Sequence, residues 1–354
     1  RAGLYEPLVS PASHSGTMIT VKRAVDEFGK EQVNVITFGD SRASQGIDND
    51  RIYRAGQAFG LNHLKLSIAG SHLMTYKALA SWSLDEMDNL RGIVIAVTPA
   101  SFAALGNGAY ELAKVMPLRN DIRASELFKH VPFRQSDIRT FAPLLSVAGY
   151  REDIKNLLAN PSRRIQAVKR RNSRRPLNIL AYTGKDEANI CAVPIAEPHE
   201  CLRVLREDDL VISDRTRTGL EELCEGVLRD RKIGAPGKAN PEVVKEWVSF
   251  LEALATKVRV MLVILPEHSI YRSYKYHPNT MPTHDAIVER LKRNSIAEVV
   301  DLHGLIMHQD VPECEFYLDA LHLNLPGKQR VTDALLPELK KFWMNVDSTG
   351  LGES

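Results

Sequence analysis

The stretch VNVITFGDS, residues 33–41, decides the fold. Six residues rich in β-branched side chains lead into a glycine, and Asp40 and Ser41 follow directly. An apolar run of this kind, closed by turn residues, is typical of a parallel strand that is covered on both faces. Because Asp and Ser commonly cap helices, we expect a helix to begin immediately after the strand.

Comparable runs recur along the chain, and amphipathic stretches lie between them. The further apolar runs are residues 64–69, 92–97, 258–265 and 298–302. The stretches with helical spacing are residues 74–88, 241–256, 282–294 and 327–342. Alternating strands and helices of this kind predict an α/β fold, with a doubly wound parallel sheet of five strands.

A large insertion is expected after the third strand. About 160 residues separate the third apolar run from the fourth, where such connections usually need only a few. We assign residues 1–105 and 239–343 to the α/β domain, and residues 106–238 to a lid or accessory subdomain over the active-site edge. Residues 344–354 read as a disordered tail. Within the insertion we expect helices at 122–129, 135–145 and 151–158 and a strand at 177–182.

The overall charge excludes little by itself. The chain has 46 Lys and Arg against 44 Asp and Glu, and a net charge of +2 does not imply a nucleic-acid partner. The strongest local charge is RRIQAVKRRNSRR at 163–175. A solvated helix face or loop is the favoured interpretation, and an anionic polymer or membrane surface is the alternative. The run has no aromatic residue, which argues against single-stranded nucleic acid.

The sequence does not decide the cellular compartment of the protein or the redox state of its cysteines. No stretch is apolar enough to span a bilayer and no signal peptide is visible. The chain begins with Arg, so we consider a trimmed ectodomain of a membrane-anchored protein, in an extracytoplasmic setting. The cysteines fit no zinc or redox pattern, and buried free thiols are expected; a Cys191–Cys201 disulfide is the alternative for an exported chain.

Two motifs carry the candidate chemistry. Ser41 follows the first strand, at the carboxyl edge where open α/β sheets place their ligands. Asp319 and His322, in DALH, follow the last strand and therefore lie at the same edge. Alone, Ser41 would be a helix cap and Asp319–His322 a surface pair. Together they predict a Ser-His-Asp triad, with Asp319 orienting His322 and His322 activating Ser41.

The same segments resemble a known enzyme family. FGDSRASQGI (38–47) and DALHLNLPGKQRVTDAL (319–335) resemble the first and last sequence blocks of GDSL/SGNH hydrolases. The resemblance implies a flavodoxin-like sheet, Ser41 as nucleophile, His322 as general base and Asp319 as its partner. It covers the sheet region and leaves the insertion unassigned.

The resemblance also implies an oxyanion hole. Its donors would be the Ser41 amide, Gly70 after the second strand and an asparagine after the third. Asn107 is the candidate asparagine, since no GxND follows the third strand. Thr98 or Ser101 in its place, or a hole with only two donors, are the alternatives.

The expected activity is acyl-ester chemistry. The chain looks similar to envelope-associated relatives that O-acetylate or D-alanylate cell-surface polymers. It is therefore expected to act as an esterase or O-acyltransferase on a carbohydrate or envelope polymer. A membrane-bound acyl-donor protein is a further expected partner, and the oligomeric state is not fixed by the sequence. A non-catalytic SGNH-like binding module is the alternative; a nucleotide binder is disfavoured, since no glycine-rich phosphate loop follows the first strand.

Other polar residues at this edge are weighed as substrate contacts. Arg42 forms either a local ion pair, which we favour, or a contact to an anionic substrate. His268 follows the fourth strand and is a second substrate-binding candidate. No cofactor and no metal are expected, because His268, His277 and His284 lack a metal-binding spacing. A second cluster, Asp301, His303, His308 and Asp310, reads as a solvated loop.

Overall fold

A computed structural model describes the α/β core and part of the segment between its third and fourth strands. The described residues are 6–11, 13–103, 105, 115–118, 151–173, 217, 218, 220, 221, 224, 237–269, 272, 278–307, 310–319 and 321–348.

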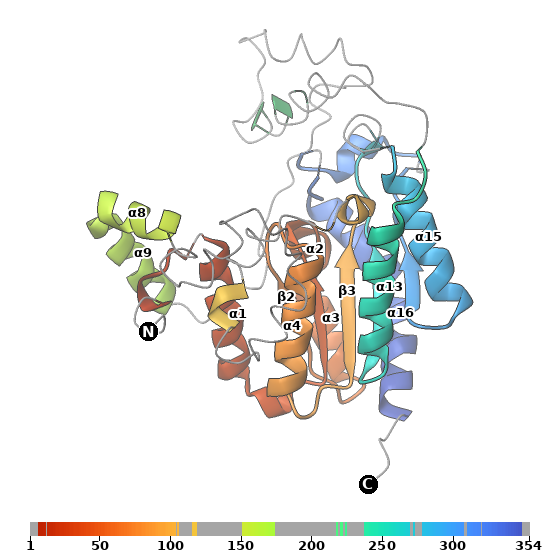
Figure 1. Ribbon diagram of the computed structural model, residues 1–354, viewed down its shortest axis with the longest axis horizontal. Helices are drawn as coiled ribbons and strands as arrows, with labels where there is room; N and C mark the ends of the chain where they lie inside the picture. The colour runs from red at the N-terminus through yellow and green to blue at the C-terminus, as the bar shows by residue number, and fades with distance from the viewer. Residues whose placement is uncertain are drawn as a thin grey trace.

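The centre of the molecule is a parallel five-stranded sheet (Figure 1). Its strands are β1 (Val35–Gly39), β2 (His63–Ser67), β3 (Gly92–Val97), β4 (Arg259–Ile264) and β5 (Glu298–Asp301). They are arranged β2-β1-β3-β4-β5, and every pair is parallel. This order is that of flavodoxin-like folds, so the predicted α/β class with a five-stranded parallel sheet is confirmed.

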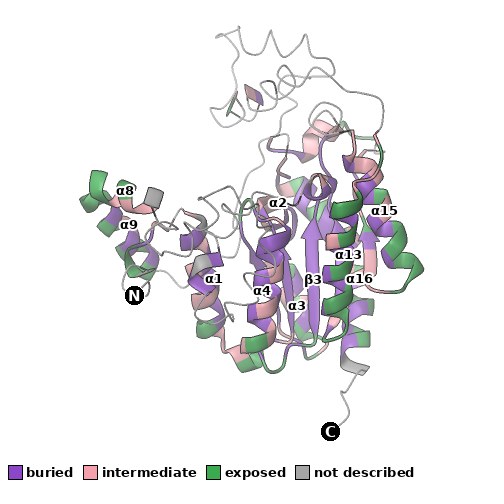
Figure 2. Ribbon diagram, in the orientation of Figure 1, coloured by how far each residue is buried: buried purple, intermediate pink, exposed green. Residues whose placement is uncertain are grey.

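Helices cover both faces of the sheet. The α-helices of the core are α1 (His14–Phe28), α2 (Ser41–Gly46), α3 (Asn49–Gln57), α4 (Leu73–Glu86), α13 (Pro241–Ala255), α15 (Thr280–Arg293) and α16 (Leu325–Ser348). Short 3-10 helices are η2 (Glu6–Leu8), η3 (Lys30–Gln32), η4 (Pro99–Phe102), η5 (Met116–Leu118) and η9 (Glu313–Phe316). Strands β1, β2 and β3 are buried throughout and β4 in all but its first residue, whereas in the edge strand β5 only Val300 is buried (Figure 2).

Alternate strand residues feed two separate hydrophobic cores, as the period of two in a strand requires. Ile36 and Phe38 point to the core shared with α1, α4, α13 and α15. Val35 points to the opposite core, shared with α2, α3 and α16. Burial on both faces explains why β1, β3 and β4 read as continuous apolar runs rather than as alternating patterns.

The turn from β1 into α2 depends on Gly39. A Cβ added there would lie 2.1 Å from the Ala43 side chain and 2.9 Å from the Ala96 carbonyl oxygen. Only glycine therefore allows α2 to start so close to the strand. Asp40 then caps the helix, accepting hydrogen bonds from the amides of Arg42 at 2.9 Å and Ala43 at 3.4 Å.

The sequence patterns missed helical residues at both ends of the chain. The tail was expected from residue 344, but α16 continues to Ser348, so residues 344–348 are helical. The reason is that Phe342, Trp343 and Val346 continue the buried stripe of this helix. Helix α1 was not predicted, although it contributes Met18 to the core.

The predicted insertion is described only in part. The expected helix at 151–158 is confirmed as α8 (Arg151–Ala159), which is followed by α9 (Pro161–Ser173). These helices lie beside η2 and α1 (Figure 1), and Asp153 accepts a hydrogen bond from the Ser10 amide at 3.2 Å. Val115 and Leu118 belong to the main core, so part of the segment packs into the α/β unit. The expected elements at 122–129, 135–145 and 177–182 lie outside the described residues.

Two cysteines differ from expectation. Cys224 and Cys314 each take part in a disulfide, so the prediction of free thiols is wrong for both. The Cys191–Cys201 alternative lies outside the described residues. Within the described part of the chain, no helix has the length and apolar character needed to cross a bilayer.

Candidate active site

The structure brings Ser41, His322 and Asp319 together in one hydrogen-bonded chain. Ser41 Oγ lies 2.9 Å from His322 Nε2. His322 Nδ1 lies 2.8 Å from Asp319 Oδ2. The carboxylate accepts the Nδ1 proton, which leaves the Nε2 lone pair to accept the serine hydroxyl proton. This is the tautomer that a general base needs.

Local structure fixes each member of the triad. Ser41 is the first residue of α2, directly after β1. Asp319 and His322 lie in a tight loop between η9 and α16. The loop is closed by an antiparallel bridge between Tyr317 and Leu323 and by a 2.8 Å hydrogen bond from the Leu318 amide to the His322 carbonyl. The two catalytic candidates therefore project from a braced hairpin rather than from a free loop.

Asp319 is held as a carboxylate. Its Oδ1 accepts hydrogen bonds from the amides of Leu321 and His322, both at 2.7 Å. Burial favours the neutral acid, but the hydrogen bond and charge of His322, with the two amides, outweigh it and hold the pKa of Asp319 below its usual value. An ionised Asp319 can stabilise the imidazolium that forms when His322 takes a proton.

Beneath the nucleophile lies a buried ion-pair network that ties together three strand ends. Arg42, from α2, contacts both Asp40 and Glu267. Its Nε donates to Asp40 Oδ2 at 2.8 Å. Glu267, after β4 and fully buried, also accepts the Thr98 hydroxyl at 2.7 Å. The network thus joins the carboxyl ends of β1, β3 and β4.

The pKa values of the two carboxylates in this network shift in opposite directions, although Arg42 acts to lower both. Burial raises the pKa of Glu267, and the Arg42 charge offsets this only in part. Burial also acts on Asp40, but the charge and hydrogen bonds of Arg42 and the Ala43 amide outweigh it and lower the pKa of Asp40. The difference arises because Asp40 accepts two hydrogen bonds from the Arg42 guanidinium, whereas the Asp40 charge adds to burial in raising the pKa of Glu267.

Arg42 is therefore engaged in ion pairs, as favoured from the sequence. Its side chain is 14% exposed, and its guanidinium contacts carboxylates from two elements. A direct contact to substrate stays a prediction. Glu267 was not singled out from the sequence, although its place after the fourth strand, at the edge that carries Ser41, was a usable signal.

The structure gives a different outcome for each of the expected oxyanion donors. Gly70 lies in the turn after β2 with a φ of 64°, a conformation that favours glycine. The Thr98 hydroxyl is committed to Glu267, which disfavours it as a substitute donor. Ser101 is buried in η4, and its hydroxyl makes no hydrogen bond. Asn107 lies outside the described residues.

His268 follows β4 at the same edge of the sheet. It is buried and packs edge-on against Tyr317, with ring centroids 5.2 Å apart. Burial lowers the pKa of His268, which favours the neutral imidazole. Because Tyr317 closes the hairpin that carries the triad, His268 supports that hairpin from below. A contact between His268 and substrate stays a prediction.

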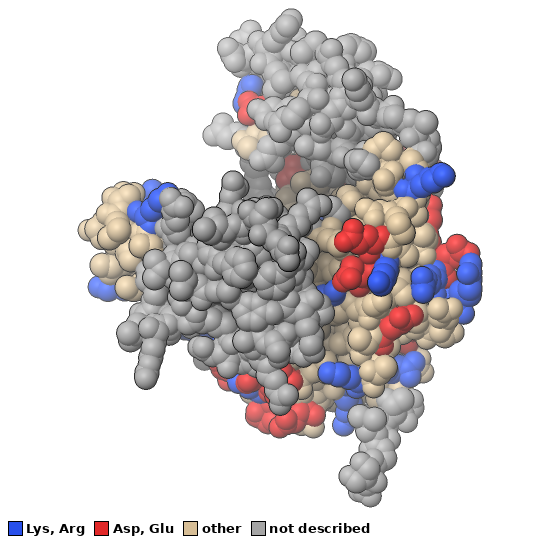
Figure 3. All heavy atoms as spheres, in the orientation of Figure 1, with Lys and Arg blue, Asp and Glu red and all other residues tan. Residues whose placement is uncertain are grey.

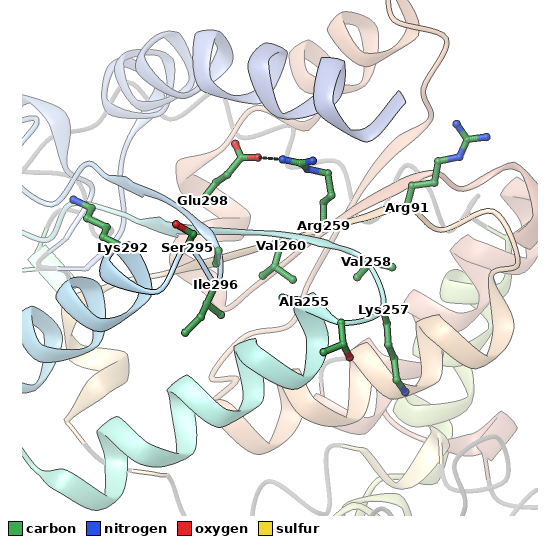
Figure 4. A pocket seen from close by; sticks show the side chains of 12 residues that line it. Arg91, Ala255, Lys257, Val258, Arg259, Val260, Lys292, Ser295, Ile296 and Glu298 are labelled. Atoms are coloured by element: carbon green, nitrogen blue, oxygen red, sulfur yellow. Dashed lines mark hydrogen bonds and ion pairs between the residues drawn. The ribbon is translucent and has the colours of Figure 1, made fainter. Parts of the chain in front are cut away.

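A hollow of about 660 Å³ lies at the opposite edge of the sheet. Its lining includes Arg91, Arg259 and Glu298, which stand at the amino ends of β3, β4 and β5 (Figure 4). Arg259 and Glu298 pair there at 3.2 Å. Because Ser41 stands at the carboxyl ends of the same parallel strands, this hollow is not part of the triad site.

The basic run at 163–175 has two distinct faces. Arg164 and Arg171 are buried, where Arg164 donates to Asp153 at 2.8 Å and Arg171 donates to the Pro7 carbonyl at 3.1 Å. Lys169 and Arg170 are exposed. The lobe of α8 and α9 carries basic side chains at the left of Figure 3, whereas the described surface of the core mixes both signs. Part of the run therefore anchors the N-terminal segment, and part faces solvent.

Comparison of the chain with protein-family models and with curated proteins gives no match.

Proposed function

We propose that this chain is a serine-dependent acyl-ester enzyme of the SGNH type, an esterase or O-acyltransferase that works through an acyl-enzyme. The observation that carries the proposal is the chain from Ser41 Oγ to His322 Nε2 and from His322 Nδ1 to Asp319, at 2.9 and 2.8 Å. Its residues come from opposite ends of the sequence and meet at the edge of the sheet where ligands bind.

The reaction follows from these contacts. Ser41 Oγ attacks the acyl carbonyl while His322 Nε2 takes its proton, and Asp319 stabilises the resulting imidazolium. The Ser41 amide at the helix start and the Gly70 amide would stabilise the oxyanion. His322 then returns the proton to the leaving alcohol, and the acyl group stays on Ser41. Water, or the hydroxyl of an acceptor, completes the cycle by the same steps in reverse.

The proposed substrate is an acylated carbohydrate or envelope polymer, and the proposed setting is extracytoplasmic. Support comes from the resemblance of residues 38–47 and 319–335 to envelope-associated proteins. The disulfide-bonded Cys224 and Cys314 support an oxidising compartment. A membrane-bound acyl donor remains a proposed partner.

One feature of the site distinguishes an enzyme from the alternative, a binding module without catalysis. Such a module has no chemical need for a serine hydroxyl aligned with a histidine whose other nitrogen faces a carboxylate. The geometry of Ser41, His322 and Asp319 therefore favours the enzyme.

Turnover of p-nitrophenyl acetate by the purified chain tests the proposal. Wild type should hydrolyse the ester, and Ser41→Ala should lower kcat by at least about 10³-fold. Ser44→Ala, one turn further along α2, is the matched control and should retain activity. Equal rates for wild type and Ser41→Ala would contradict the proposal.

A further inference from the structure

A second cluster of ligating side chains lies at the carboxyl end of β5. His284 comes from α15, Asp301 ends β5 and His303 follows it. One ligating atom from each of the three lies within 4.8 Å of the others. None of them belongs to the Ser41–His322–Asp319 chain, so the inference below does not rest on the proposed function.

The second ring nitrogen of the buried histidine faces a carboxylate without a short hydrogen bond. His284 is 2% exposed, and its Nε2 is buried without a hydrogen bond. Asp301 Oδ2 lies 3.5 Å from that nitrogen, outside good hydrogen-bonding range. Two ligands that each lie about 2.1 Å from a tetrahedral ion are about 3.4 Å apart, so this separation fits a shared cation.

A carboxylate outside the cluster orients the same histidine. Asp285 Oδ1 lies 2.8 Å from His284 Nδ1 and accepts its proton. The second ring nitrogen, Nε2, then faces Asp301 Oδ2. Metal-binding histidines usually donate their second ring nitrogen to a carboxylate or carbonyl in this manner, which fixes the tautomer and raises the basicity of the ligand.

The surroundings leave a route for an ion. The His303 side chain is 29% exposed, and its Nδ1 lies 2.7 Å from Asp301 Oδ1. Phe102 packs against the inner side, with its ring centroid 5.9 Å from that of His284. One side of the cluster is thus apolar and closed, and the other is open to solvent.

We propose that His284, Asp301 and His303 form a binding site for a divalent transition metal ion of the Zn²⁺ type. Two imidazoles and one carboxylate are a common zinc ligand set, and they leave a fourth position for water or another ligand. The set was not found in the sequence because its members come from a helix and a strand end, without a recognisable spacing.

The experiment is a calorimetric titration of the full, untagged, EDTA-dialysed chain with Zn²⁺. We expect one equivalent to bind in wild type and in His322→Ala. His303→Ala removes a ligand and should weaken binding by on the order of 100-fold. Asp285→Asn removes only the orienting carboxylate and should weaken it by roughly 10-fold. Asp285 is 70% exposed, so this variant should fold even if substitutions of buried His284 do not.

Asp310→Asn is the matched control, because it removes an exposed carboxylate on the following loop that is not in the cluster. It should bind Zn²⁺ as wild type does. The proposal is overturned if wild type binds no Zn²⁺, if His303→Ala and Asp285→Asn bind as wild type does, or if Asp310→Asn weakens binding as much as they do. A protonated His284 paired with Asp301 would give the first of these results.

Discussion

His322 Nε2 lies 2.9 Å from Ser41 Oγ, although 281 positions separate the two residues in the sequence. The sheet explains how they meet. Strand β1, which leads into Ser41, lies between β2 and β3, and all five strands run parallel, so every loop that follows a strand emerges at one edge. The hairpin before α16 needs only to reach back along that edge to place His322 above the start of α2.

The members of the triad should not contribute equally. His322→Ala removes the proton acceptor, so kcat for p-nitrophenyl acetate should fall by about 10⁶-fold. Asp319→Ala leaves the imidazole and should cost roughly 10⁴-fold. Thermal unfolding of both variants controls for loss of the hairpin, because Asp319 also holds two amides. Equal and negligible losses from both substitutions would show that another base takes the proton.

Gly70 should contribute to catalysis through the position of its backbone amide. Gly70→Ala strains a backbone at φ 64°, which should displace the amide and lower kcat by about 10²-fold, the scale of a lost oxyanion donor. Gly60→Ala is the matched control, since Gly60 has a φ of 69°, open space around it and a position at the other edge of the sheet. If both substitutions affect kcat alike, Gly70 is not an oxyanion donor.

The network under the nucleophile should be a stability element. Arg42→Met leaves buried Asp40 and Glu267 without their shared cation, so the free energy of unfolding in urea should drop by about 3–5 kcal/mol. Adding Glu267→Gln should recover part of the loss, because one uncompensated charge is gone. Additive destabilisation by the two substitutions would show that Arg42 and Glu267 are not coupled.

The exposed side chains of the basic run should affect binding to anionic surfaces and leave the chemical step unchanged. Lys169→Ser with Arg170→Ser should leave p-nitrophenyl acetate turnover unchanged and weaken binding to anionic vesicles at low salt. Arg171→Ala should instead destabilise the chain, because the Arg171 side chain bonds the Pro7 and Val9 carbonyls. Unchanged vesicle binding by the double variant would identify the run as purely structural.

Much of the fold could be predicted from the sequence because its strands and helices show local sequence patterns. All five strands lie within two residues of their predicted ends, and the apolar signal is plainest in β1, β3 and β4, which are buried on both faces. Ser41 and Asp319–His322 were found because two recognisable motifs follow the first and last strands, and the topology brings the ends of these strands to one edge.

What the sequence did not predict depends on contacts between distant elements. Arg42 and Glu267 are 225 positions apart, and no local pattern pairs them. The same holds for His284, which was weighed with His268 and His277, while Asp301 and His303 were assigned to a separate solvated cluster. The extension of α16 to Ser348 depends on Trp343 and Val346 meeting the second core, which a sequence window near the chain end does not reveal.

The most direct measurement for the central claim is labelling by a fluorophosphonate, followed by intact-mass analysis and peptide mapping. The aligned Ser41 and His322 predict a single adduct on the peptide that contains Ser41, retained in Ser44→Ala and absent from Ser41→Ala. A folded chain that gains no adduct, or that is labelled equally after Ser41→Ala, would contradict the assignment of Ser41 as the nucleophile.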